Sequence, residues 1–161
     1  MLHNSDTGEP MGDVYQGVWS VDGGWAATTD SGDNPIVMPK GSPGAARRYT
    51  YTPPPDEAKR HDGWGVRSVS IDGRYVSVGW TGPDRSRNLG SFAVVDTVTS
   101  KVVDLPVTGA VSSIHFLADN TVLVRVVGGQ LVLLDQRFTV LDQTTEPASV
   151  RNLPLLRYVT T

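Results

Sequence analysis

The chain of 161 residues contains no cysteine, so disulfide bonds, thiolate catalysis and cysteine-bound metal ions are excluded. Charge is also sparse: 14 basic and 17 acidic residues give a formal net charge of −3. A mildly acidic protein gains nothing from counterion release at a nucleic acid or from attraction to anionic lipid. We therefore expect no nucleic-acid partner.

Long apolar runs are missing as well. The longest, such as residues 131–134, are far too short to cross a bilayer, and residues 1–13 lack the charged-then-apolar pattern of a signal peptide. The chain as given is predicted to be soluble, with no direct insertion into a membrane. Glycine and proline are frequent, at 17 and 11 residues, which suits a fold with many turns.

Three stretches of the sequence resemble one another: VWSVDGGWAAT at 18–28, SVSIDGRYVSV at 68–78 and SSIHFLADNTVLV at 112–124. In each, apolar residues alternate with polar ones on both sides of a turn, and the first two share the same Ser-x-Asp-Gly turn. Alternation predicts half-buried strands, and Asp-Gly predicts the hairpin turn between them. Similar units of about 40–50 residues built from short strands are typical of β-propeller blades.

The sequence therefore predicts an all-β protein made of repeated four-stranded antiparallel blades. We expect a single domain whose units span about 14–52, 66–105 and 111–142, with a long loop at 53–65 and a tail at 144–161 that includes one more possible strand from 153. Helix is nearly absent, and the one candidate is at 55–60. The predicted strands are Val14–Val21, Trp25–Thr29, Ile36–Met38, Tyr49–Thr52, Val66–Ile71, Tyr75–Trp80, Ser91–Asp96, Lys101–Leu105, Val111–Phe116, Thr121–Val127, Gln130–Asp135 and Phe138–Asp142.

The stretches SVSIDGRYVSVGW (68–80) and FAVVDTVTSKVVDLPV (92–107) resemble the blades of WD40-like and TolB-like propellers. This resemblance implies a propeller fold that binds a protein partner, in a bacterial protein that is exported or tethered to a membrane. The chain departs from the pattern because it lacks the Gly-His to Trp-Asp frame of a strict WD40 repeat. Three units are also too few, since propellers close with at least four blades. The chain is thus predicted to be a partial propeller or a homo-oligomer that completes the ring, with a small β-sandwich or open barrel as the remaining alternative.

Candidate functional residues gather in the predicted loops. Trp64, between two glycines, is a possible partner anchor or a side chain that pins its loop to the core. Arg85 and Arg87 are predicted to share a rim with acidic residues of 30–34, as a mixed-charge surface suited to protein contact. His61 and Asp62 complete the predicted partner-binding set.

The function predicted from these features is a non-catalytic binding or scaffold module, with no cofactor and no metal. The DSGDN stretch at 30–34 has oxygen ligands for calcium but lacks the distal glutamate of a calcium loop. One alternative is the propeller domain of an enzyme, with a site near His61 and His115. The other is a structural unit that assembles through open sheet edges, where Val103 and Leu141 would lie on outer strands.

Overall fold

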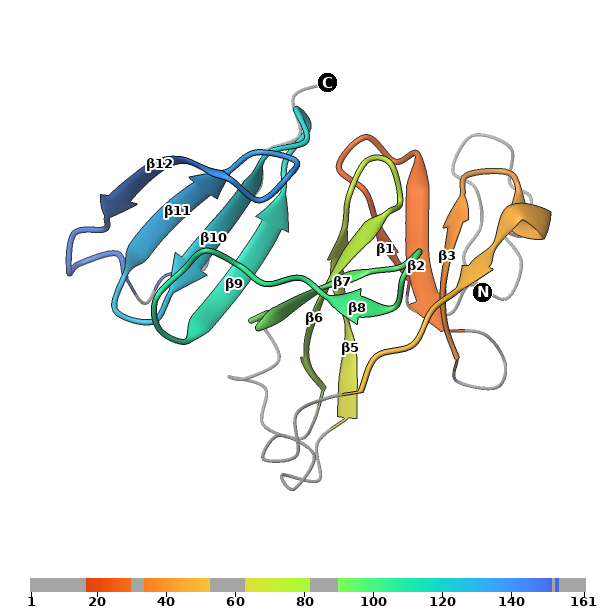
Figure 1. Cartoon of the computed structure of the whole chain (residues 1–161), viewed down its shortest axis with the longest axis horizontal. Helices are drawn as coiled ribbons and strands as arrows, with labels where there is room; N and C mark the ends of the chain where they lie inside the picture. Colours follow the sequence, from red (N-terminus) through yellow and green to blue (C-terminus); the bar gives the residue numbers. More distant parts are fainter. Residues whose placement is uncertain (1–16, 30–33, 53–62, 82–89, 152, 154–161) are drawn as a thin grey trace.

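The computed structural model describes residues 17–29, 34–52, 63–81, 90–151 and 153. This part of the chain folds into three four-stranded antiparallel sheets, and its one helix is the short 3₁₀ turn η1 (Pro43–Ala45). In each sheet the strands follow one another in chain order, so every sheet is a meander like a propeller blade. Figure 1 shows the three sheets side by side, with the middle one between the other two. The predicted all-β fold of repeated blades is confirmed.

The strands of the first blade are β1 (Val18–Trp19), β2 (Trp25–Thr29), β3 (Pro35–Pro39) and β4 (Arg47–Arg48). Those of the second are β5 (Gly63–Val69), β6 (Tyr75–Thr81), β7 (Ala93–Asp96) and β8 (Lys101–Val102). Those of the third are β9 (Val111–Phe116), β10 (Val122–Val126), β11 (Gln130–Leu134) and β12 (Val140–Thr145). The three similar stretches of sequence thus form the first hairpin of each blade.

The Ser-x-Asp-Gly turn has the same hydrogen bonds in the first two blades. In the second, Ser70 Oγ donates to Asp72 Oδ1 over 2.6 Å and accepts the amide of Tyr75 at 2.9 Å. Asp72 Oδ1 also accepts the amide of Arg74 at 3.0 Å, and Gly73 takes φ +67°, which glycine adopts without strain. The first blade repeats these contacts at Ser20, Asp22, Gly23 and Trp25.

The turn of the third blade is one residue shorter. Its closing bond runs from the Leu117 amide to the Thr121 carbonyl at 2.9 Å, and Asn120 takes the positive φ in place of glycine. Asp119 Oδ1 accepts both the amide and the hydroxyl of Thr121.

Two apolar cores lie between the blades, and the middle blade contributes to both. Because neighbouring residues of a strand face opposite ways, Val95 packs toward the first blade and Val94 toward the third. The core between the first two blades contains the buried side chains of Ala27, Val37, Tyr49, Val69, Val76, Val78 and Val95. The core between the last two contains those of Val94, Ile114, Phe116, Val122, Val124, Val132, Leu134 and Phe138.

Some predicted boundaries were wrong. The outer strand of the first blade is β4 rather than 49–52, because Tyr49 turns inward and is buried beyond the strand end. In the third blade, Phe138 occupies the turn before β12 with φ +63°, and β12 continues through Thr145 into the segment predicted as tail. β5 begins at Gly63, inside the predicted long loop, because Gly63 pairs with Thr81. The helix predicted at 55–60 lies outside the described residues.

No helix in the described ranges is long and apolar enough to cross a membrane.

Candidate protein interface

Four aromatic side chains cluster at one end of the middle blade. Trp64 lies near the start of β5 and pairs across the hairpin with Trp80 near the end of β6. Tyr51, from the segment after β4, meets Trp64 edge-on with ring centroids 4.8 Å apart. Phe92 lies 4.9 Å from Trp80 and 6.3 Å from Tyr51. All four side chains are half-buried, so the aromatic cluster has an apolar interior and an outer surface that a partner can contact.

Trp64 was predicted to lie in a loop, and the structure places it in a strand. Its neighbours in β5 and β6 hold its backbone in the sheet, and its ring packs against the core between the first two blades. The alternation rule missed this because glycine stands on both sides of Trp64 and interrupts the strand pattern. The ring nevertheless remains partly accessible, so packing and partner contact are compatible at this residue.

The other predicted interface residues lie outside the described residues. His61 and Asp62 immediately precede β5, and Arg85 and Arg87 belong to the segment that follows β6. Gly63 and Thr81 are paired, so both segments are joined to the same end of the middle blade, where the aromatic cluster lies. The sequence analysis assigned these residues to two separate loops, and the pairing of the strands brings the attachment points together. The acidic residues at 30–33 also lie outside the described residues.

Arg67 is a residue that the sequence analysis missed. It is the bulged residue of β5, where the pairing with β6 shifts between Val66 and Ser68, and its side chain packs against Gly79. Within the described residues, its buried Nε and Nη2 have no hydrogen-bond acceptor. Burial lowers its pKa. A charged residue inside the strand pattern is the signal that could have marked it.

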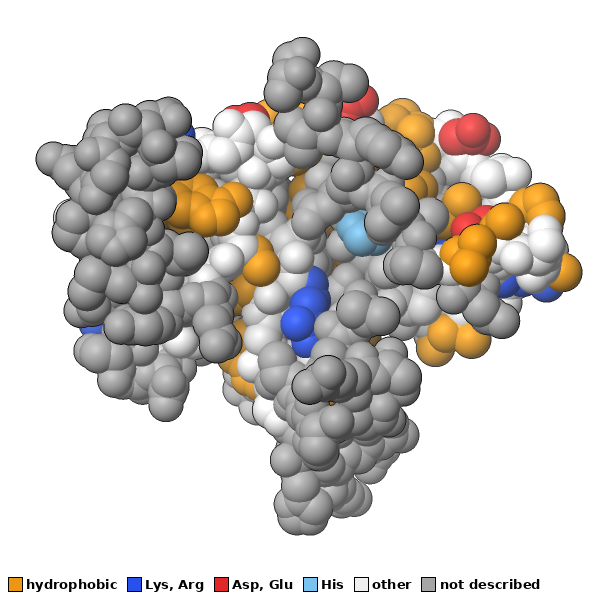
Figure 2. All heavy atoms as spheres, turned by 180° about the vertical axis from the view of Figure 1, so that it is seen from behind, with side chains coloured by type: hydrophobic (Ala, Val, Ile, Leu, Met, Phe, Trp, Pro, Cys, Tyr) orange, Lys and Arg blue, Asp and Glu red, His pale blue; other side chains and the backbone are white. Residues whose placement is uncertain are grey.

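On one face of the protein, basic and polar groups are interspersed with apolar ones. Figure 2 shows separate apolar patches on one face, with a Lys or Arg side chain and a histidine near its middle. Such a mixture resembles an ordinary protein-contact surface more than a bulk apolar patch.

His115 lies in β9 and is half-buried opposite Leu123. The proposed enzymatic site needs His61 and His115 to converge, and His61 is outside the described residues. Among the residues that the structure describes, no group of three or more His, Cys, Asp or Glu side chains could hold a metal ion.

Neither a scan against models of protein families nor a search of curated proteins finds a match for this chain. The likeness to propeller blades accordingly rests on the architecture of the three sheets and on the repeated turns.

Proposed function

We propose that this chain is a non-catalytic protein-binding module built from propeller-like blades of the WD40 or TolB kind. The aromatic cluster at Tyr51, Trp64, Trp80 and Phe92 is the observation that carries this proposal. Partly exposed Trp and Tyr side chains that are already held in place lose little entropy on binding, and such residues dominate the energetics of protein interfaces. The blades supply a rigid support, and the segments joined to this end supply further contacts from His61, Asp62, Arg85 and Arg87.

Arg67 adds a reason for a polar contact near this surface. Arg67 is only partly buried, so a carboxylate of a partner would pair with the accessible part of its side chain, whereas Nε and Nη2 have almost no accessible surface. A partner with an apolar anchor beside an acidic group would satisfy both the aromatic cluster and the guanidinium.

The test begins with purification of a partner by the full chain under mild crosslinking, followed by a binding measurement with the purified pair. We expect Trp64→Ala and Trp80→Ala each to weaken binding at least tenfold. Val127→Ala, at an exposed residue that follows β10 in another blade, is the matched control and should leave the affinity unchanged. Full affinity in both tryptophan variants, with folding intact, would refute the proposed interface.

Self-assembly is the second candidate function, and β12 favours it. All six residues of this outer strand are exposed, including Val140 at 42% and Leu141 at 55%. Among the described residues no strand pairs with the outer edge of β12, and such a partly apolar edge strand is a template for pairing with another chain. A second copy that pairs with β12 would extend the sheet of the third blade.

Sedimentation velocity decides between a monomer and an assembly. If β12 is the contact, wild type sediments as an oligomer, Leu141→Asp sediments as a folded monomer, and Lys101→Asp on the outer strand of the middle blade changes nothing. A monomer at all concentrations, or an oligomer that survives Leu141→Asp, excludes assembly through this edge.

A further inference from the structure

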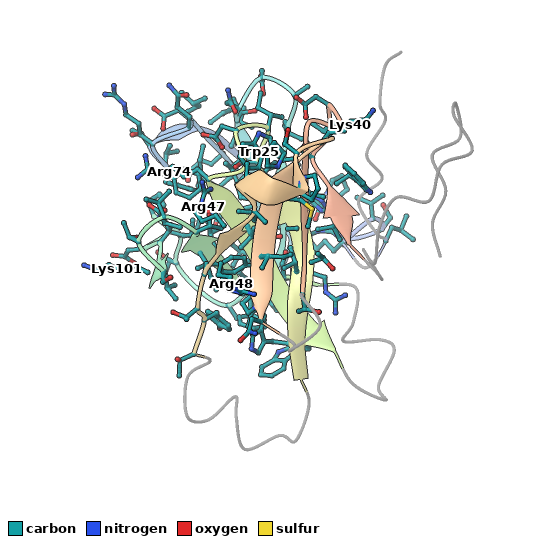
Figure 3. The ribbon with its side chains drawn as sticks, turned by 90° about the vertical axis from the view of Figure 1, so that its right-hand side faces the viewer. Trp25, Lys40, Arg47, Arg48, Arg74 and Lys101 are labelled. Atoms are coloured by element: carbon teal, nitrogen blue, oxygen red, sulfur yellow. The ribbon has the colours of Figure 1, made fainter. Side chains whose placement is uncertain are left out.

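The junction between the first two blades is closed by residues that reach across it. The indole ring of Trp25 lies directly on Gly73, in the space that a side chain at residue 73 would fill. Arg47, from β4, lies over this ring at 5.8 Å, and its Nη2 donates to the Gly73 carbonyl at 2.9 Å and to Thr97 Oγ1 at 2.8 Å. Figure 3 shows Arg47 and Arg74 close to Trp25, whereas Lys101 points away from the blades.

The corresponding place between the second and third blades is open. Strand pairing shows which residues of the second junction correspond to those of the first. Tyr75 corresponds to Trp25, and Asn120 corresponds to Gly73. Val103 occupies the place of Arg47. Tyr75 leans edge-on against Phe138 at 4.9 Å, and a valine is too short to cross the junction. A cavity of about 390 Å³ remains there, and its lining includes Asp72, Arg74, Tyr75, Asn120, Gln136 and Arg137.

The lining of this cavity contains groups that correspond to the two oxygen atoms to which Arg47 donates in the first junction. Asn120 has φ +65°, close to the +67° of Gly73. Its amide donates to the carbonyl of the residue three before it, as the amide of Gly73 does. The backbone carbonyl of Asn120 therefore corresponds to the Gly73 carbonyl that Arg47 binds. Gln136 follows β11 as Thr97 follows β7, and it brings a side-chain carbonyl in place of the hydroxyl.

The charges around the cavity are largely balanced. Arg74 is held by Asp96 at 2.9 Å and lies over the ring of Tyr75 at 5.1 Å, so its charge is already paired. Arg137 lies near Asp135. The hydrogen bond from the Thr139 amide is the main cause that lowers the pKa of Asp135, and the charge of Arg137 adds to this effect. Within the described part of the chain, Asp72 forms its hydrogen bonds through Oδ1 in its own turn, which leaves Oδ2 for a ligand.

We propose that this cavity binds a guanidinium group, as the arginine side chain of a partner protein. The cation would bond the Asn120 carbonyl, the Gln136 side chain and Asp72, as Arg47 bonds the first junction from within the chain. The planar guanidinium suits such a set of separated acceptors beside aromatic rings. The cavity lies at the end of the β5–β6 hairpin away from Trp64, so this site does not depend on the aromatic cluster.

The test is a nuclear magnetic resonance titration of the full ¹⁵N-labelled chain with N-acetyl-arginine amide. We expect saturable shifts of the Tyr75, Asn120 and Gln136 amides, with a Kd on the order of 1–10 mM for so small a ligand. N-acetyl-citrulline amide, which has the same shape without the charge, should bind at least fivefold more weakly. Asp72→Asn keeps the turn acceptor but loses the charge, and should weaken arginine binding about threefold to fivefold.

Asp22→Asn, at the equivalent position of the first blade, is the matched control and should bind arginine as wild type does. Trp64→Ala should also bind as wild type, which separates this site from the proposed interface. The proposal is overturned if no saturable shift occurs at these amides, if citrulline binds equally well, or if N-acetyl-glutamate amide binds in place of arginine.

Discussion

Arg125 of β10 and Glu146, just beyond β12, form a buried ion pair with two hydrogen bonds of 2.6 and 2.7 Å. Arg125 is only 8% exposed and Glu146 only 7%. Arg125 also donates to the carbonyls of Leu153 at 2.6 Å and Val150 at 3.0 Å. The pair therefore fastens the segment after β12 against the third blade.

Breaking this pair is expected to be costly because the remaining charge stays buried without its partner. Glu146→Ala should lower the free energy of unfolding by about 3–5 kcal/mol, measured by urea denaturation. Arg74→Ala is the control: its ion pair with Asp96 is half-exposed at the arginine, so the loss should be at most about 1 kcal/mol. Equal losses in the two variants would contradict the buried role of the Arg125 pair.

Gly73 is expected to tolerate a side chain far less well than Gly23. Both have positive φ, +67° and +69°, so alanine at either residue costs about 1 kcal/mol of backbone strain. A methyl group at residue 23 meets nothing, whereas at residue 73 it overlaps the ring of Trp25. Gly73→Ala should therefore destabilise the protein by about 2 kcal/mol more than Gly23→Ala in the same denaturation assay.

The double variant Gly73→Ala with Trp25→Ala tests the cause of that difference. If the ring is responsible, the two losses are not additive, and the double variant is more stable than the sum predicts. Additive losses would mean that the overlap is relieved elsewhere.

Ser70 is expected to stabilise its turn through two hydrogen bonds. Ser70→Ala removes the donor to Asp72 and the acceptor of the Tyr75 amide, and should cost about 1–2 kcal/mol. Ser20→Ala removes the same pair of bonds in the first blade and should cost a similar amount. Thermal unfolding of the two variants checks this, and a loss in only one of them would show that the two turns are not equivalent.

Acid is expected to destabilise the protein through its turn aspartates. Hydrogen bonds from Ser20 and the Gly24 amide lower the pKa of Asp22 below its ordinary value of 3.8, and bonds from the Thr121 hydroxyl and amide do the same for Asp119. Burial raises the pKa of Asp96, but the bonds from Arg74 and two amides outweigh that effect. A lowered pKa stabilises the fold above the unfolded pKa, and this stabilisation is lost as pH falls through the folded value.

The midpoint temperature should accordingly stay level from pH 7 to about pH 5 and fall below about pH 4. Asp119→Asn keeps an acceptor oxygen but cannot ionise, so its deficit against wild type should be largest near neutrality and shrink as pH falls below about 4. A deficit that grows with acid would contradict this account.

The hairpin pattern was visible in the sequence because its causes are local. Alternating residues around Asp72 and Gly73 fix both strands and turn within a dozen residues, and the same grouping recurs near Asp22 and Asp119. The ends of the outer strands were not predicted correctly, because they depend on contacts that the residues after each strand make with distant parts of the chain. β4 stops where Tyr49 enters the core, and β12 continues where Glu146 meets Arg125.

One residue of the aromatic cluster could also be anticipated. Trp64 was predicted to be a possible anchor. Its neighbour Tyr51 comes from the segment that follows β4 of the first blade, far from Trp80 and Phe92 in sequence. Arg67 could be recognised only from the burial of its Nε and Nη2 in the structure. Contacts of this kind join residues that no short-range pattern relates.

Three blade-like units could be predicted from the sequence alone, because strand alternation and turn chemistry act between near neighbours. The fit between adjacent blades could be read only from the folded protein, because it depends on the volumes of side chains that meet across a junction. Trp25 and Arg47 fill the first junction, whereas Tyr75 and Val103 leave the second one open, and units of similar sequence thereby acquire different surfaces.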